Sequence, residues 1–199
     1  MFFKTPSILK NLNIEQKLTV LAPVFTKEES VLDFGCGDLS LAKALKSRNP
    51  SLTITGVDVV NVKDKPSEIS FFTYNGSQLP FKDRTFDTTI SFYVFHHCKD
   101  VEASLRECVR VAKKRIIVVE SVARNPIELP FMRFLDWLYN IWKPEPIPLT
   151  YQFLTLMQWQ KLFKKADLIV KTQKAITIML QPPFLPIGRS YLFVLRRRQ

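Results

Sequence analysis

Short apolar runs alternate with polar, glycine-containing or proline-containing turns over residues 1–120. Two stretches, from Leu39 to Leu45 and from Val101 to Lys114, place apolar residues at helical spacing. Strands that alternate with helices predict an α/β fold with a mainly parallel, doubly wound sheet and helices on both faces. The runs with the length and the β-branched or aromatic content of strands are Val31–Leu32, 51–58, 69–74, 88–92 and 116–119.

Residues 129–142 stand out because nearly all of them are large and apolar. In a helix that begins near Pro130, the polar residues Arg133, Asp136 and Asn140 share one narrow stripe. Each large side chain left in water would forgo about 1.5–3 kcal/mol. The segment therefore needs a cover, which protein, a lipid-like substrate or a membrane interface could supply.

The C-terminal residues complete the pattern of a single domain. Thr155 and Gln158 have the spacing of a capping box that opens a helix, and residues 169–180 and 190–196 have the pattern of two strands. A chain of 199 residues can bury a sizeable core but is short for two domains. We divide it into an N-terminal helical segment, a core, an insertion and a C-terminal helix with a strand pair: 1–29, 30–120, 121–154 and 155–199.

A glycine turn follows the first predicted strand, in the sequence Asp33-Phe34-Gly35-Cys36-Gly37. Gly35 and Gly37 permit backbone angles and close approaches that a Cβ would block. A turn at the carboxyl end of a parallel strand is where doubly wound sheets bind small ligands. No glycine stands three residues after Gly37, so the pattern departs from a dinucleotide-binding turn. An ordinary strand-to-helix turn is the alternative.

An acidic residue at the end of the second predicted strand supports a nucleoside ligand. Asp58 follows the glycine turn by about twenty residues, and a carboxylate there can accept two hydrogen bonds from a ribose diol. Dehydrogenases and methyltransferases share this arrangement, so Asp58 does not choose between them.

The D-x-G-x-G motif resembles the cofactor loop of the class I S-adenosylmethionine-dependent methyltransferases. The resemblance implies that the two glycines cradle the methionine part of the cofactor, with Cys36 between them, and that Asp33 places its amino group. Many members of the family have a further glycine at the position of Leu39. The floor of the pocket is therefore expected to differ there.

A second stretch, from Asn75 to His97, resembles the L-P-F…S-F-D…L-H-H signature of the UbiE-like small-molecule branch, with its methyltransferase type 11 domain. That branch usually has an acid at Asn75 that touches the adenine amino group, and an asparagine oxygen can accept the same hydrogen bond. The resemblance covers residues 30–120. It implies a seven-stranded sheet with an antiparallel C-terminal strand and an α-helical substrate lid at 121–154. The implied cofactor-binding residues are Asp33, Gly35, Cys36, Gly37, Asp58, Val59, Asn75, Gly76 and Ser91.

Candidate catalytic residues follow the fourth predicted strand. Tyr93, His96 and His97 could face the methyl group, and one of the histidines would be the general base where the acceptor must lose a proton. The alternative is that each residue only shapes the pocket or contacts the cofactor.

We expect no metal, because adjacent histidines on a strand or loop point in different directions and no partner stands at metal-like spacing.

Positive charge is concentrated toward the C-terminus. The net charge is +11, and residues 121–199 hold 12 Lys and Arg against 4 Asp and Glu, a net of +8. Such an excess attracts nucleic acid, an anionic membrane surface or an acidic substrate, or it is simply a solvated basic surface.

Three cysteines without metal-like spacing favour a reducing compartment. With no secretory signal and no run long enough to span a bilayer, we expect a cytoplasmic protein, peripheral to a membrane at most.

Three functions remain open. The first is an enzyme that methylates a small, apolar or lipid-like acceptor with S-adenosylmethionine by direct in-line transfer. The second is an RNA methyltransferase, supported only by the basic C-terminal third and weakened because Ser91-Phe92-Tyr93-Val94 replaces the Asn/Asp-Pro-Pro-Tyr/Phe loop of adenine-type amino methylation. The third is a non-catalytic binding module of the same fold. The acceptor atom and the oligomeric state stay open.

Overall fold

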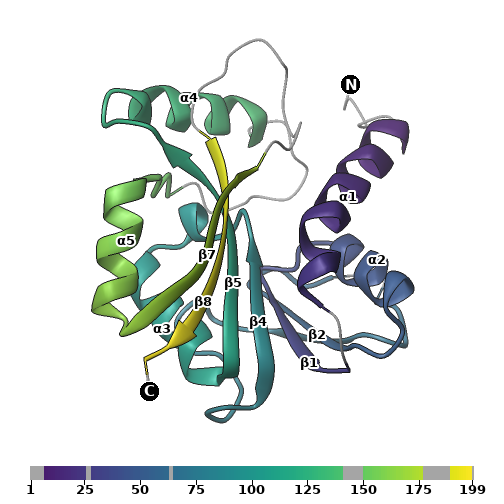
Figure 1. The fold of residues 1–199 in the computed structure, drawn as a ribbon. Helices are drawn as coiled ribbons and strands as arrows, with labels where there is room; N and C mark the ends of the chain where they lie inside the picture. Colours follow the sequence, from purple (N-terminus) through teal and green to yellow (C-terminus); the bar gives the residue numbers. More distant parts are fainter. Residues whose placement is uncertain (1–6, 26–27, 63–64, 141–149, 177–188, 199) are drawn as a thin grey trace.

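A computed structural model describes residues 7–25, 28–62, 65–140, 150–176 and 189–198 (Figure 1). The strands are β1 (Ser30–Phe34), β2 (Thr53–Asp58), β3 (Ser70–Thr73), β4 (Phe86–Phe92), β5 (Ala112–Ala123), β6 (Leu154–Thr155), β7 (Leu168–Ile176) and β8 (Arg189–Arg197). The helices are α1 (Ser7–Leu21), α2 (Ser40–Arg48), α3 (Val101–Val111), α4 (Glu128–Asn140) and α5 (Leu156–Lys165), with 3-10 turns η1 (Ala22–Val24) and η2 (Phe95–His97).

All strands belong to one sheet in the order β3-β2-β1-β4-β5-β8-β7, and β6 pairs with β5 outside this path. The pairs from β3 through β5 are parallel, whereas β8 runs antiparallel to both β5 and β7. The predicted mainly parallel sheet with an antiparallel C-terminal strand is therefore confirmed. The two-residue β6 was not predicted, because so short a pairing leaves no pattern in the sequence.

Helices cover both faces of the sheet, with α1 and α2 on one side and α3 and α5 on the other (Figure 1). The sheet separates two buried clusters, and successive residues of β5 enter them in turn. Ile116 and Val118 belong to the cluster under α3 and α5, whereas Ile117 and Val119 belong to the cluster under α1 and α2. A strand buried on both faces explains why the run 116–119 is continuously apolar.

The boundary between α3 and β5 differs from the prediction. The helix ends at Val111 and the strand begins at Ala112, so Lys113-Lys114-Arg115 lie in the strand and not in the last turn of a helix. Lys114 Nζ lies 3.0 Å from Asp87 Oδ1. The Arg115 guanidinium pairs with Glu29 and donates to Thr88 Oγ1 over 2.9 Å. Asp87 and Thr88 on the neighbouring strand β4, together with Glu29 just before β1, hold the basic residues in the sheet.

The C-terminal elements follow the predicted pattern where the structure describes them. The Thr155–Gln158 capping box is present and opens α5, which buries Trp159 and Phe163. The predicted strand 169–180 is β7, and its last four residues lie outside the described part of the chain, as does the proline-rich connection 143–148. Within the described ranges, no helix is long and apolar enough to cross a membrane.

Candidate functional site

The glycine loop between β1 and α2 is tied to the end of β2. Gly35 N and Cys36 N both donate to Val57 O, over 2.8 and 3.2 Å. Gly37 N donates to Asp58 Oδ2 over 2.8 Å. Two features predicted from separate parts of the sequence thus form one polar edge at the carboxyl ends of neighbouring parallel strands.

The two glycines of the loop serve different purposes. Gly35 has a φ of +71°, and a Cβ there would lie 2.3 Å from Cγ1 of Val94. Gly37 has a φ of +53°, but a Cβ there would meet nothing within 4 Å. Gly35 is therefore required by the packing of the protein, whereas Gly37 borders open space that a ligand can approach.

Leu39 occupies the position where many members of the resembling family have glycine. It has a left-handed backbone, with a φ of 62°, and its side chain is completely buried. A Cβ on Gly56 of β2 would lie 2.5 Å from Leu39 Cδ2, so the absence of a side chain at Gly56 makes room for the leucine. The strained backbone costs about 1–2 kcal/mol. Burying a leucine side chain is worth about 1.5–3 kcal/mol, which offsets that strain.

Two polar groups at this edge are buried without a hydrogen-bond partner among the described residues. They are Asp33 Oδ2, at the end of β1, and Ser91 Oγ, on the adjoining strand β4. Burial raises the pKa of Asp33 to about 7, and the nearby Lys17 of α1 partly opposes this shift. Buried polar groups are rarely left unpaired, so both groups are candidates for contact with a bound ligand.

The loop after β3 places Asn75 and Gly76 close to the end of β2. Asn75 Oδ1 accepts hydrogen bonds from Ser77 N and Gln78 N, over 2.9 and 3.2 Å. The oxygen predicted to accept from adenine is thus used by the turn itself, which leaves the amide nitrogen of Asn75 to donate. Gly76 has a φ of +82°, and a Cβ there would stand 3.6 Å from Val59 Cγ1.

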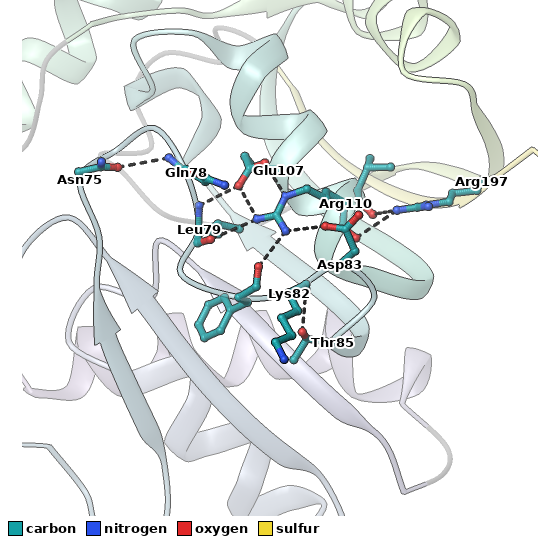
Figure 2. Close-up of polar contacts among 11 residues, drawn as sticks. Asn75, Gln78, Leu79, Lys82, Asp83, Thr85, Glu107, Arg110 and Arg197 are labelled. Atoms are coloured by element: carbon teal, nitrogen blue, oxygen red, sulfur yellow. Dashed lines mark hydrogen bonds and ion pairs between the residues drawn. The ribbon is translucent and has the colours of Figure 1, made fainter.

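Arg110 of α3 fixes the Leu79-Pro80-Phe81 stretch (Figure 2). It donates to Phe81 O and Leu79 O, over 2.8 and 3.1 Å, and pairs with Asp83 and Glu107. Glu107 Oε2 in turn accepts from Leu79 N over 2.8 Å. Hydrogen bonds from Arg110 and to Glu107 therefore fix the L-P-F stretch, which adjoins the loop that carries Asn75.

The candidate catalytic residues lie in and before η2, and the buried Glu120 of β5 organises them. Glu120 Oε1 accepts from Phe95 N over 2.7 Å, and Oε2 lies 2.8 Å from His96 Nδ1. The Tyr93 hydroxyl forms a 2.5 Å hydrogen bond with Ser190 Oγ, and burial raises its pKa. Tyr93 is therefore protonated at neutral pH and is unsuited to act as a base.

Helix α4 meets the histidines with its polar side. Asp136 is buried, with its carboxylate oxygens 3.9 Å from His96 Nε2 and 3.9 Å from His97 Nδ1. Phe153 stacks on the His96 ring with 4.6 Å between ring centroids. Both segments of the 121–154 insertion that the structure describes thus contact η2. In Figure 1, α4 lies above the end of β5.

Several residues of this region were not identified from the sequence. Glu107 and Arg110 lie three positions apart in a helix and so share a face, but nothing local shows that this face meets the 79–83 loop. Asp136 is the acid within the largely apolar stretch 129–142, which was the available signal for an inward-pointing group.

A methyltransferase domain family matches residues 32–119. A demethylmenaquinone methyltransferase of Thermotoga maritima is 31% identical over 127 residues, covering 60% of this chain and 53% of the relative. A ubiquinone/menaquinone biosynthesis C-methyltransferase UbiE of Bartonella bacilliformis is 27% identical over 173 residues, covering 75% and 64%. This chain therefore spans less than two thirds of the length of either curated relative.

Similarity in fold extends over nearly the whole chain. A chain in the solved complex of the Haloferax volcanii Trm112 methyltransferase activator with a methyltransferase has a TM-score of 0.74 at 16% identity. The match covers 97% of the present chain and 93% of the other. At this identity the likeness concerns the fold alone.

Proposed function

We propose that the chain is a class I S-adenosylmethionine-dependent methyltransferase of the UbiE-like branch and that it methylates a small apolar acceptor. The observation that carries the proposal is the edge formed by Asp33, Gly37 and Asp58. Because the two relatives are named for quinone biosynthesis, we propose a quinone-type ring as the acceptor.

The described residues fit S-adenosylmethionine. The orphaned Asp33 carboxylate suits its amino group, and the open space at Gly37 admits its methionine part. Each carboxylate oxygen of Asp58 accepts one backbone hydrogen bond, from Gly37 N or from Val60 N. Each oxygen keeps a further lone pair that can accept from a ribose hydroxyl. Asn75 can donate through its amide nitrogen to the adenine ring, and Ser91 Oγ offers a further polar contact. Cys36, Val59 and Gly76 line the same loops.

The chain's part in the reaction is chiefly positioning. When bound, the cofactor supplies a methyl group on positively charged sulfur, with the leaving group built in. Holding the acceptor in line with this methyl group can be worth about 7–11 kcal/mol of the barrier. We place the acceptor beside η2, where His96 and His97 can contact its reacting group and Glu120 fixes the orientation of His96.

Cofactor affinity is expected to rise with pH around neutrality. Asp33, with a pKa of about 7, is mostly neutral at pH 6 and mostly ionised at pH 8, and a cationic ligand binds the ionised form. Since only about a tenth of the chains carry the ionised form at pH 6, the contribution of Asp33 should make the affinity about tenfold lower there than at pH 8. Calorimetry in buffers of different ionisation enthalpy should also detect proton release on binding at pH 6.

The control for this effect is Asp33→Asn, which keeps the size of the side chain but cannot ionise. The cofactor's own amino group titrates equally with both proteins, so the difference between them isolates Asp33. We expect the variant to bind more weakly and to lose the additional pH dependence. An identical pH profile in both proteins would contradict the placement of Asp33 at the cofactor.

We also propose that the outer face of α4 rests on an anionic membrane surface. Phe131 and Phe134 are each 56% exposed, Trp137 is 42% exposed and Leu138 is 43% exposed. The helix thus turns Asp136 and Met132 inward and these four large apolar side chains outward. An apolar helical face on a strongly basic chain suits shallow insertion among anionic lipids, and it would bring an apolar acceptor close to the site.

The Phe134→Ser/Trp137→Ser double variant tests this contact. We expect it to lower affinity for phosphatidylglycerol-containing vesicles at least tenfold, because each large apolar side chain is worth about 1.5–3 kcal/mol when buried. Met157→Ser on α5 removes an even more exposed apolar residue elsewhere and should bind as the unchanged chain does. A concentration-dependent dimer that the double variant abolishes, without vesicle binding, would instead assign this face to a second copy.

The proposed reaction is tested by transfer of label from methyl-labelled S-adenosylmethionine to fractionated acceptors. We expect label in a demethylated quinone precursor and none in RNA. Label that enters RNA, with a salt-dependent affinity for RNA, would favour the second enzyme function.

A further inference from the structure

Two histidines and an aspartate from separate parts of the chain converge beside η2. His96 and His97 come from η2 itself, and Asp136 comes from α4, 39 residues further along the chain. One ligand atom from each of the three lies within 4.8 Å of the other two. The two rings are 4.1 Å apart between centroids, so these neighbouring histidines do not diverge as the sequence suggested.

Glu120 prepares His96 for a ligand at its other nitrogen. The glutamate carboxylate lies 2.8 Å from Nδ1, so it accepts the proton of that nitrogen and leaves Nε2 directed toward Asp136. Metal-bound histidines almost always donate their second ring N–H to such a carboxylate or carbonyl, which fixes the tautomer. Glu120 is completely buried and lies outside the three-residue cluster, so it is an independent observation.

The separations suit a bound cation better than direct hydrogen bonds. His96 Nε2 and His97 Nδ1 each lie 3.9 Å from an oxygen of Asp136, beyond hydrogen-bond distance. Nitrogen and oxygen ligands about 2.0–2.2 Å from a tetrahedral zinc ion are roughly 3.3–3.6 Å apart. With one ligand atom from each residue the separations are at most 4.8 Å, so side-chain movements of up to about 1–1.5 Å would close the site around an ion.

We propose that His96, His97 and Asp136 bind a divalent transition-metal ion of the zinc class. Two imidazoles and one carboxylate are a ligand set for such ions, and three protein ligands leave a fourth position for an oxygen ligand. The ion joins α4 to η2 and so fixes the insertion over the carboxyl edge of the sheet. His96 and His97 are then ligands and not proton acceptors. The site needs neither the cofactor nor the acceptor for its assembly, and an ion held there would take the place of the direct contact between these histidines and the acceptor.

Cobalt titration of the chelator-treated full chain tests the site without any methyl-transfer assay. We expect one Co²⁺ per chain, with the visible absorption of a four-coordinate site, displacement by Zn²⁺ and a higher unfolding temperature with either ion. The chain has only two histidines, so broadening of both imidazole NMR signals by Co²⁺ reports on this site directly. A thiolate charge-transfer band would instead assign the ion to cysteine and overturn the proposal.

Variants of matched size complete the test. Asp136→Asn should lower Co²⁺ affinity at least tenfold, and Glu120→Gln should lower it about 10- to 100-fold through the orientation of His96. Asp167→Asn removes an exposed carboxylate elsewhere and should leave affinity unchanged. Absence of saturable binding to the unchanged chain, or equal affinity in Asp136→Asn and Asp167→Asn, would show that the cluster is only a buried ion-pair network. Should Asp136→Asn fail to fold, the NMR signals of the unchanged chain still decide the question.

Discussion

Replacing Asp58 by alanine is expected to weaken S-adenosylmethionine binding at least about 100-fold. Each hydrogen bond from a ribose hydroxyl to a carboxylate is worth about 1.5–3 kcal/mol, and two of them amount to about 3 kcal/mol or more, or two orders of magnitude in affinity. The substitution also removes the acceptors of Gly37 N and Val60 N and so loosens the glycine loop. Calorimetric titration of the folded variant measures the loss directly.

Asp58→Asn is the matched control, because it keeps the volume and one acceptor oxygen but not the charge. We expect intermediate affinity for this variant and an unfolding transition close to that of the unchanged chain for both. Undiminished affinity in Asp58→Ala would place the nucleoside elsewhere in the molecule.

Replacing Gly35 by alanine is expected to lower the free energy of unfolding by about 3 kcal/mol or more. A left-handed backbone costs a side-chain-bearing residue about 1–2 kcal/mol, and an overpacked contact adds about 1–3 kcal/mol. The added Cβ would meet both methyl groups of Val94, at 2.3 and 2.5 Å. Because valine is stiff about χ1, rotation offers it little escape. Urea unfolding measures this effect.

Gly37→Ala separates packing from ligand binding within the same loop. A methyl group there meets no protein atom within 4 Å, so the expected destabilisation is limited to the backbone cost of about 1–2 kcal/mol. The same methyl group should nevertheless obstruct the cofactor and lower its affinity. Equal destabilisation by the two substitutions would contradict the different purposes assigned to these glycines.

The cofactor edge could be predicted from the sequence because its signals are local. Asp33, Gly35 and Gly37 lie within five residues, and strand alternation places Asp58 at the end of the neighbouring strand. What could not be predicted is how these residues are supported. The contact between Leu39 and Gly56, and the use of Asn75 Oδ1 by its own turn, depend on distances that no periodicity encodes.

The orientation of α4 shows a second limit. The polar stripe and the apolar residues around it could be identified in the sequence, and the helix is present. Hydrophobicity alone, however, predicts that the apolar side of such a helix faces inward. Asp136 is buried beside His96 and His97, which lie about forty residues earlier in the chain, so this acid shares the inner side of the helix with the apolar Met132. Likewise, Arg115 lies in β5 because its partner Glu29 precedes β1. Charge pairs between residues far apart in the chain leave no pattern in a short stretch of sequence.

Calorimetric titration of the unchanged chain with S-adenosylmethionine tests the central claim most directly. The proposed pocket predicts saturable one-to-one binding that NAD does not compete with, since the loop lacks the third glycine of a dinucleotide-binding turn. A folded chain that shows no binding of S-adenosylmethionine would contradict the assignment of Asp33, Gly37 and Asp58 to the cofactor, and with it the proposed methyl transfer.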